Sequence, residues 1–236
     1  MSSATITTSA RLMNFTPQTE EQAMVRKVAV SSFLGNFIEW FDYASYSYFA
    51  TTIALVFFPT DNHTVAMLQT FGVFALSFIL RPIGALFWGS YGDKKGRKAA
   101  LAHSIMFMSG ASFLIGCLPS YSVIGVGAPI LLLLLRMVQG FAASGEYAGA
   151  ATFLGEYAPT SKRGIYCSLI PASTAIGLLA GSTLATLMTA NMNSSAMVGW
   201  GWRVPFLLAG PLGLIVLYIR AKLADSPVYQ SMNDAL

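Results

Sequence analysis

Six long apolar segments, separated by short polar connections, run through this 236-residue chain. A hydrocarbon core of about 30 Å requires roughly 20 helical residues to cross it, and each segment approaches or exceeds that length. We therefore predict an all-α integral membrane protein with six transmembrane helices. The predicted spans are residues 28–56, 65–88, 99–118, 125–154, 165–190 and 204–221.

The composition supports this class and excludes others. Hydrophobic residues make up 55% of the chain and charged residues only 10%, as is typical of membrane proteins. The formal net charge is +4, and in a membrane chain such an excess reflects basic loops on the cytoplasmic side. The expected partner is therefore the lipid bilayer and not nucleic acid.

Lysine and arginine lie almost entirely on one side of the six predicted spans. The other side has Arg203 alone. By the positive-inside rule, both termini face the cytoplasm. We predict a cytoplasmic tail at 1–27, a transmembrane bundle at 28–222 and a second cytoplasmic tail at 223–236. The basic residues on the predicted inner side are Arg11, Arg26, Lys27, Lys94, Lys95, Arg97, Lys98, Lys162, Arg163, Arg220 and Lys222.

A few ionisable residues fall inside the predicted spans. Glu39 and Asp42 are three residues apart in the first span and so share a helix face. Arg81 lies in the second span, and Arg136 and Glu146 lie in the fourth. A charge at mid-depth costs about 2.5–3.5 kcal/mol on insertion scales, so each is a functional candidate. The carboxylates are candidates for carrying a proton and the arginines for binding substrate, while structural pairing that locks the helices remains the alternative.

Small residues recur at helical spacing in two spans. The patterns Gly145-x-x-x-Gly149 and Gly177-x-x-x-Gly181 give the fourth and fifth spans flat faces that permit close backbone contact. Such faces suit helices that slide or rock, and they suit ordinary static packing equally well.

The sequence GSYGDKKGRK at residues 89–98 connects the second and third spans. Its glycines would allow a tight turn where side chains would clash. Its aspartate can accept from a helix N-terminus or pair with a basic neighbour, and its basic residues would hold the turn in the cytoplasm. The residues of this predicted cytoplasmic loop are Gly89, Gly92, Asp93, Lys94, Gly96, Arg97 and Lys98.

This loop resembles the signature between helices two and three of the major facilitator superfamily: Gly, any, aromatic or Leu, Ala or Gly, Asp, basic, any, Gly, Arg, basic. Other segments are similar to its metabolite:proton symporter branch, which includes bacterial proline/betaine, alpha-ketoglutarate, citrate and shikimate carriers. These segments are GNFIEWFDYASY, LRPIGALFWG, RMVQGFAASGEYAGA, APTSKRG and GWGWRVPFLLAGPLG.

The resemblance implies a secondary active transporter of the bacterial inner (plasma) membrane that carries a small metabolite with protons by alternating access. The loop would then gate the cytoplasmic side. Arg136 matches a conserved basic position linked with proton coupling, and Gln139 and Glu146 match the motif around it. Glu39 and Asp42 match acidic positions of the first helix. No cofactor and no metal are expected.

Members of the superfamily have twelve spans in two halves, with substrate bound between them. The chain corresponds to the N-terminal half. We expect a truncated gene product, a subunit that pairs with a separate C-terminal half, or a homodimer of two identical halves. A non-transporting truncated or regulatory membrane protein is the alternative function. The substrate is either a carboxylate or a zwitterionic osmolyte.

An intramembrane serine protease is a rival class, because an Ala-Ser-Gly run surrounds Ser144. Such a nucleophile needs a histidine base, usually from a later helix, and no histidine follows Ser144 in the sequence. The chain is therefore not expected to be an enzyme.

Overall fold

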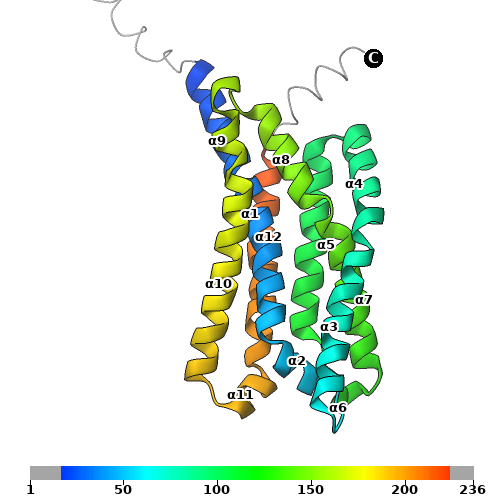
Figure 1. The fold of residues 1–236 in the computed structure, drawn as a ribbon. Coiled ribbons are helices and arrows are strands. Elements are labelled where there is room, and N and C mark those ends of the chain that lie inside the picture. The colour runs from blue at the N-terminus through cyan, green and yellow to red at the C-terminus, as the bar shows by residue number, and fades with distance from the viewer. Residues whose placement is uncertain (1–16, 224–236) are drawn as a thin grey trace, which may run out of the picture.

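The computed structural model describes residues 17–223, and the regular secondary structure in that range is helical throughout. Figure 1 shows long helices that stand side by side between two ends of the molecule. Residues 1–16 and 224–236, which hold most of the two predicted tails, lie outside the described residues.

Several predicted spans consist of two consecutive helices. The first corresponds to α1 and α2, the second to α3 and α4, the fourth to α7 and α8, and the fifth to α9 and α10. The helices are α1 (Pro17–Tyr48), α2 (Ala50–Phe57), α3 (His63–Ile79), α4 (Arg81–Lys95), α5 (Arg97–Cys117), α6 (Tyr121–Ile124), α7 (Gly127–Ala143), α8 (Glu146–Tyr157), α9 (Arg163–Cys167), α10 (Leu169–Asn191), α11 (Ser194–Gly199) and α12 (Val204–Ala221). Two 3₁₀ turns, Thr160–Lys162 and Gly201–Arg203, complete the described chain.

Five helical stretches in the described range are long and apolar enough to cross a membrane. They coincide with the second to sixth predicted spans. The first helix is the exception because it carries serine, asparagine and acidic residues along its length. It contacts α10, α12 and α8, so these polar side chains lie inside the bundle. The prediction of an all-α membrane bundle is confirmed. The five stretches are His63–Lys95, Arg97–Cys117, Gly127–Tyr157, Thr160–Asn191 and Gly201–Ala221.

The first helix starts earlier than the predicted first span. α1 begins at Pro17, inside the segment assigned to the N-terminal tail. Residues 17–27 are therefore helical and continue the span toward one end of the bundle (Figure 1).

The second span is interrupted at Leu80, where α3 ends and α4 begins. Pro82 lies in the first turn of α4, a position where its missing N–H is not needed for the helix. Arg81 is thus the first residue of a new helix, placed midway through the span.

The turn expected over residues 89–98 is shorter than predicted. α4 continues through Gly89 and Gly92 to Lys95, and α5 begins at Arg97. Gly96 alone leaves the helix, with a φ of 95° that favours glycine. The placement of Gly89 and Gly92 in the turn was therefore wrong. Gly92 instead lies within α4 and faces α5, where a Cβ would make an ordinary contact, 3.4 Å from the Cβ of Ala100.

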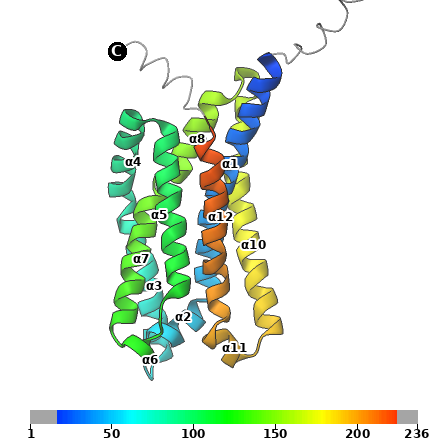
Figure 2. The same cartoon turned by 180° about the vertical axis from the view of Figure 1, so that it is seen from behind.

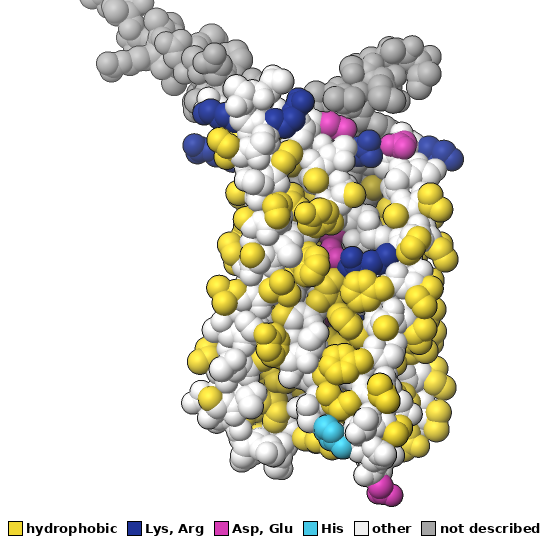
Figure 3. Space-filling view, viewed as in Figure 1, with side chains coloured by type: hydrophobic (Ala, Val, Ile, Leu, Met, Phe, Trp, Pro, Cys, Tyr) yellow, Lys and Arg dark blue, Asp and Glu magenta, His cyan; other side chains and the backbone are white. Residues whose placement is uncertain are grey.

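Basic side chains gather at one end of the bundle (Figure 3). This basic end holds the α4–α5 turn, the α8–α9 connection, the start of α1 and the end of α12 (Figures 1 and 2). We define it by Arg26, Lys27, Lys94, Lys95, Arg97, Lys98, Lys162, Arg163 and Lys222.

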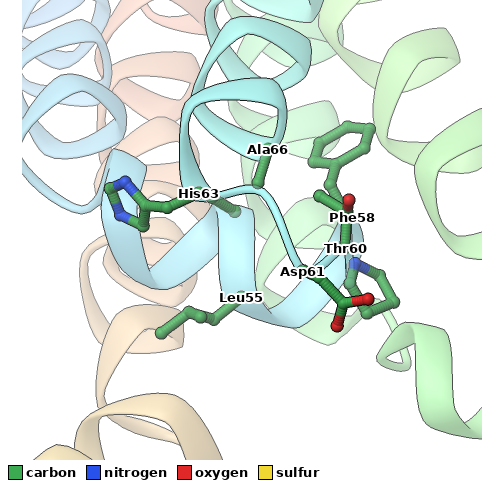
Figure 4. Close-up of a pocket in the computed structure, with 8 residues that line it drawn as sticks. Leu55, Phe58, Thr60, Asp61, His63 and Ala66 are labelled. Atoms are coloured by element: carbon green, nitrogen blue, oxygen red, sulfur yellow. The ribbon is translucent and has the colours of Figure 1, made fainter.

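The opposite end holds α6, α11 and the α2–α3 connection. An open pocket of about 570 Å³ lies beside that connection and is lined by Leu55, Phe58, Asp61 and His63, among others. Figure 4 shows that the side chains of Asp61 and His63 point in different directions, so they do not form a joint site.

Glycines bring α10 directly against α1. A Cβ on Gly177 would lie 2.8 Å from the carbonyl oxygen of Phe37, and one on Gly181 would lie 2.6 Å from the Cβ of Ala44. The Gly-x-x-x-Gly face of the fifth span therefore packs on the helix that carries both Glu39 and Asp42. Close contact between these two backbones is possible only because glycine has no side chain there.

Replacing Gly181 by alanine is expected to lower stability, because the new methyl group would overlap Ala44 and overpacking costs about 1–3 kcal/mol. Gly72→Ala is the matched control: no heavy atom lies within 4 Å of its Cβ position, and alanine favours a helix by about 0.5–1 kcal/mol. Thermal unfolding in detergent compares the two variants. A midpoint for G181A at or above that of G72A would contradict the close contact.

Candidate functional site

The three carboxylates singled out in the sequence are buried inside the bundle. Their exposed fractions are 1% for Glu39, 4% for Asp42 and 1% for Glu146. Each forms an ion pair with an arginine from another helix. A carboxylate in an apolar interior keeps its charge only beside such a partner, so the pairs fix which helices are neighbours.

Asp42 on α1 has hydrogen-bond donors on both of its carboxylate oxygens. Arg136 Nη1, from α7, lies 2.6 Å from Oδ2. Ser112 Oγ, from α5, donates to Oδ1 at 2.9 Å, and Gln139 Nε2 donates to the same oxygen at 3.2 Å. Gln139 also donates to Ser112 at 2.5 Å, which closes a small ring of hydrogen bonds. The sequence-predicted residues Asp42, Arg136 and Gln139 therefore form one cluster.

Aromatic rings hold the guanidinium of Arg136 in place. It lies 3.9 Å from the ring centroid of Tyr46 and 5.5 Å from that of Phe206. Tyr46 is itself fixed, because its hydroxyl donates to the carbonyl oxygen of Thr70 on α3. A cation held against ring faces in a buried site is stabilised by the ring quadrupoles. The Asp42 cluster is thus tied to five helices: α1, α3, α5, α7 and α12.

Glu39 lies one helical turn from Asp42 and pairs with Arg81, whose Nη2 is 2.5 Å from Oε1. The same nitrogen also donates to the hydroxyl of Tyr43. The guanidinium lies 4.7 Å from the ring centroid of Phe78 and 5.1 Å from that of Tyr43. Within the described part of the chain, Glu39 Oε2 and Arg81 Nε have no hydrogen-bond partner. This pair is therefore incomplete.

The Glu39–Arg81 pair also differs from the other two pairs in the exposure of its arginine. The side chain of Arg81 is 27% exposed, whereas those of Arg136 and Arg220 are 1% exposed. Figure 3 shows basic and acidic side chains together, midway between the two ends, on a face that is otherwise apolar or uncharged. We call the face on which Arg81 is partly exposed the open face. A charge at this depth on that face suits a site that a ligand can reach.

Glu146 begins α8 and forms the third pair with Arg220 near the end of α12. Arg220 also donates to the carbonyl oxygens of Leu101, at 2.5 Å, and Ser31, at 3.3 Å. Ser104 donates to Glu146 Oε2 at 3.1 Å. These bonds join α1, α5, α8 and α12. Both oxygens of Glu146 are bonded, so its carboxylate is fully paired, although Arg220 Nε has no partner among the described residues.

The sequence places Arg220 among the basic residues of the inner side and does not single it out as an internal charge, whereas its side chain is buried and pairs with Glu146. Because Arg220 lies close to the end of a span, the sequence did not indicate that its side chain points inward. The signal that could have found it is Glu146, because an acid within a span requires a cation at a similar depth. Gly35 supports the pair, since a Cβ there would collide with both charged groups.

Arg203 is the one basic residue that the sequence places at the outer ends of the spans, and the sequence predicts no contacts for it. Its Nη1 donates to the carbonyl oxygens of Gly116, at 2.8 Å, and Leu118, at 2.5 Å. These carbonyl groups lie at the C-terminal end of α5, where helices leave acceptors without an internal partner. Arg203 therefore caps one helix from the start of another.

The residues of the predicted gating loop lie at the basic end. Arg97 is 3.4 Å from Asp93 on α4 and 3.7 Å from Glu156 on α8. Asp93 is exposed, and such surface pairs contribute only about 0–1 kcal/mol. The Asp93–Arg97 ion pair between α4 and α5 is thus a weak contact.

The described residues contain no group of three or more His, Cys, Asp or Glu side chains that could hold a metal ion. A bundle of membrane-spanning helices with charged groups paired in its interior is typical of multi-pass transport proteins. Residues 27–236 match the family described as Sugar (and other) transporter. The chain belongs to this family of the major facilitator superfamily.

Curated relatives share substantial sequence identity with the chain. It is 41% identical over 216 residues to the Proline/betaine transporter of Salmonella typhimurium, an alignment that covers 92% of this chain and 43% of that protein. It is 42% identical over 216 residues to the Glycine betaine/proline/ectoine/pipecolic acid transporter OusA of Dickeya dadantii, with the same coverage. The chain therefore spans less than half the length of these relatives.

Solved structures show the same fold at low sequence identity. The proton:xylose symporter XylE bound to 6-bromo-6-deoxy-D-glucose superposes with a TM-score of 0.80 and 16% identity, covering 90% of this chain and 47% of that chain. The partially occluded inward open XylE from E. coli gives 0.79 and 17%, covering 89% and 52%. The six-helix bundle is thus one half of a major facilitator fold.

Removing Arg220 should be strongly destabilising, because Glu146 would be left as an unpaired buried charge. We expect Arg220→Met to cost about 3–5 kcal/mol and the double variant Glu146→Gln/Arg220→Met to recover much of that loss. Thermal unfolding in detergent measures both. Lys222→Met, which removes an exposed cation two residues away, is the control and should change stability little. A double variant no more stable than R220M would contradict the buried ion pair.

Proposed function

We propose that the chain is the N-terminal half of a secondary transporter that carries a small zwitterion together with protons across a bacterial plasma membrane. The observation that carries this proposal is the row of charged side chains paired inside membrane-spanning helices. Buried charges in such helices mark ion and substrate pathways, since purely structural packing would be cheaper with apolar residues.

The substrate class follows from two observations. The relatives are named for proline, betaine, ectoine and pipecolic acid, which carry a carboxylate and a positive nitrogen together. The open face offers one partly exposed arginine surrounded by aromatic rings, which suits a single carboxylate. Of the two substrate classes that the sequence left open, the zwitterion is therefore favoured over a di- or tricarboxylate.

Transport by alternating access requires a second body opposite the face that carries Arg81. Substrate in such carriers binds between two six-helix halves near mid-membrane, and the halves rock around it. The relatives are about twice as long as this chain. The second body is a further part of the same polypeptide, a separate subunit or a second copy of this chain.

Proton coupling uses a carboxylate whose arginine can be withdrawn. While the arginine is near, the carboxylate stays ionised. When the arginine turns to another partner, the neutral acid becomes the cheaper state in the apolar interior, so the acid takes up a proton. Reversal of these steps on the other side of the membrane releases substrate and proton together. The contacts around Arg97 at the basic end open and close as the halves move.

Uptake into proteoliposomes tests this function. Carrier purified through a tag on this chain, with whatever partner completes it, should accumulate labelled glycine betaine or proline when the outside is made acidic. The imposed gradient should raise uptake several-fold, and a proton ionophore should abolish the increase. Uptake that ignores the pH gradient would reject proton coupling, and no uptake of either compound would reject the substrate class.

The basic end faces the cytoplasm in this proposal, because lysine and arginine are retained on that side. Labelling with a membrane-impermeant thiol reagent tests the orientation after Cys117 and Cys167 have been replaced by serine. Asp61→Cys should react in intact cells, whereas Lys95→Cys should react only after permeabilisation. Both positions are exposed in the structure, so accessibility to the reagent is matched. The reverse pattern would invert the assignment.

A further inference from the structure

The three buried ion pairs are not equivalent. Both oxygens of Asp42 and both oxygens of Glu146 receive hydrogen bonds. Glu39 is equally buried, yet among the described residues its Oε2 has no partner. Its arginine, Arg81, is the most exposed arginine of these three buried pairs. The incomplete carboxylate and the accessible cation thus occur in the same pair.

The guanidinium of Arg81 has donors left for a second carboxylate. Both of its hydrogen bonds leave from Nη2, to Glu39 Oε1 and to the Tyr43 hydroxyl. A guanidinium has five N–H donors in a planar fork that matches a carboxylate, so most of the donors of Arg81 have no partner among the described residues. The rings of Phe78 and Tyr43 lie beside the group and fix its direction.

The position of Arg81 in the chain allows it to change partners. It is the first residue of α4, directly after the interruption at Leu80 and before Pro82. A residue at a helix start is less constrained than one inside a continuous helix, because its own N–H is not held by an intrahelical bond. A small change at this break would turn the guanidinium away from Glu39 without unwinding either helix.

We propose that Arg81 is shared between Glu39 and the carboxylate of the transported zwitterion, and that this exchange couples proton uptake to substrate binding. The substrate carboxylate displaces Glu39 from Arg81, and Glu39 then takes a proton from the water on the open side. The new O–H bond forms on the Glu39 carboxyl, and its unpartnered Oε2 is the atom free to receive it. No other covalent bond changes, and the site gains one positive charge. The inference rests on the proposed function.

Competition for one arginine makes the coupling obligatory. An ionised Glu39 without Arg81 would be a lone charge in an apolar interior, which is strongly unfavourable, whereas the protonated acid needs only a hydrogen bond. Substrate bound at Arg81 therefore favours protonated Glu39, and protonated Glu39 frees Arg81 for substrate. By linkage the two effects are equal. Asp42 and Glu146, whose oxygens are all bonded, then hold the bundle together while this exchange occurs.

Proton uptake during binding measures the exchange directly. The purified carrier, isolated with its partner through a tag on this chain, is mixed with glycine betaine in weakly buffered detergent solution containing a pH indicator. A proton should be taken up for each molecule bound, and the affinity should rise up to about tenfold per unit fall in pH. Choline, which lacks the carboxylate, is the matched probe and should cause no proton uptake.

Glu39→Gln should bind glycine betaine with no proton uptake and with an affinity independent of pH, because its amide cannot be ionised. Asp61→Asn removes an exposed acid at the end opposite the basic end and should behave as the parent protein does.

Arg81→Gln alone would leave Glu39 unpaired. The double variant Glu39→Gln/Arg81→Gln keeps the interior neutral and therefore tests Arg81. It should elute as the parent does on size exclusion yet bind at least a hundredfold more weakly.

Three results would overturn the inference. The first is proton uptake that persists in E39Q, which would assign the proton to another acid while leaving proton-coupled transport intact. The second is unchanged betaine affinity in the double variant, and the third is proton uptake driven by choline. If the parent carrier binds neither glycine betaine nor proline and transports neither, the proposed function itself fails, and the inference fails with it.

Discussion

Charges buried inside membrane-spanning helices must be paired, and this constraint organises the whole bundle. The pair Asp42–Arg136 joins α1 to α7, Glu39–Arg81 joins α1 to α4, and Glu146–Arg220 joins α8 to α12. Helices in a membrane gain little from apolar contact alone, because lipid is as apolar as their side chains. The ion pairs therefore supply the specificity that decides which helices are neighbours. Helix α1, which carries two of these three carboxylates, accordingly lies within the bundle and contacts α8, α10 and α12.

Close packing of backbones is the second requirement, because short hydrogen bonds between helices need short distances between their axes. A Cβ on Gly140 would collide with the carbonyl oxygen of Ser77, so α7 lies directly on α3. This approach places the neighbouring Gln139 within reach of Asp42. Gly35 on α1 leaves room for the Glu146–Arg220 pair in the same way. The glycine positions and the ion pairs thus depend on each other.

The sequence predicted the spans well, because hydropathy is a property of each segment by itself. It also located Glu39, Asp42 and Arg136 as internal charges, since they lie far from any span end. It could not assign partners, because pairing depends on how the helices pack. Arg220 was missed for a related reason: near a span end, a long side chain can extend to water or turn inward. The extent of the turn at Gly96 also escaped prediction, because a glycine serves a turn and a tight helix contact equally well.

The difference in completeness among the three pairs has a physical consequence. A pair with every oxygen bonded is expensive to open, because both groups lose all their partners at once. Asp42 and Glu146 are of this kind, and they join several helices that would otherwise separate. Glu39 and Arg81 lose less on parting, because one oxygen of Glu39 has no partner among the described residues and Arg81 partly reaches the open face. A structure that must hold six helices rigid and still exchange one ionic contact needs both kinds of pair, and the helix break at Leu80 places the exchangeable one at mid-depth.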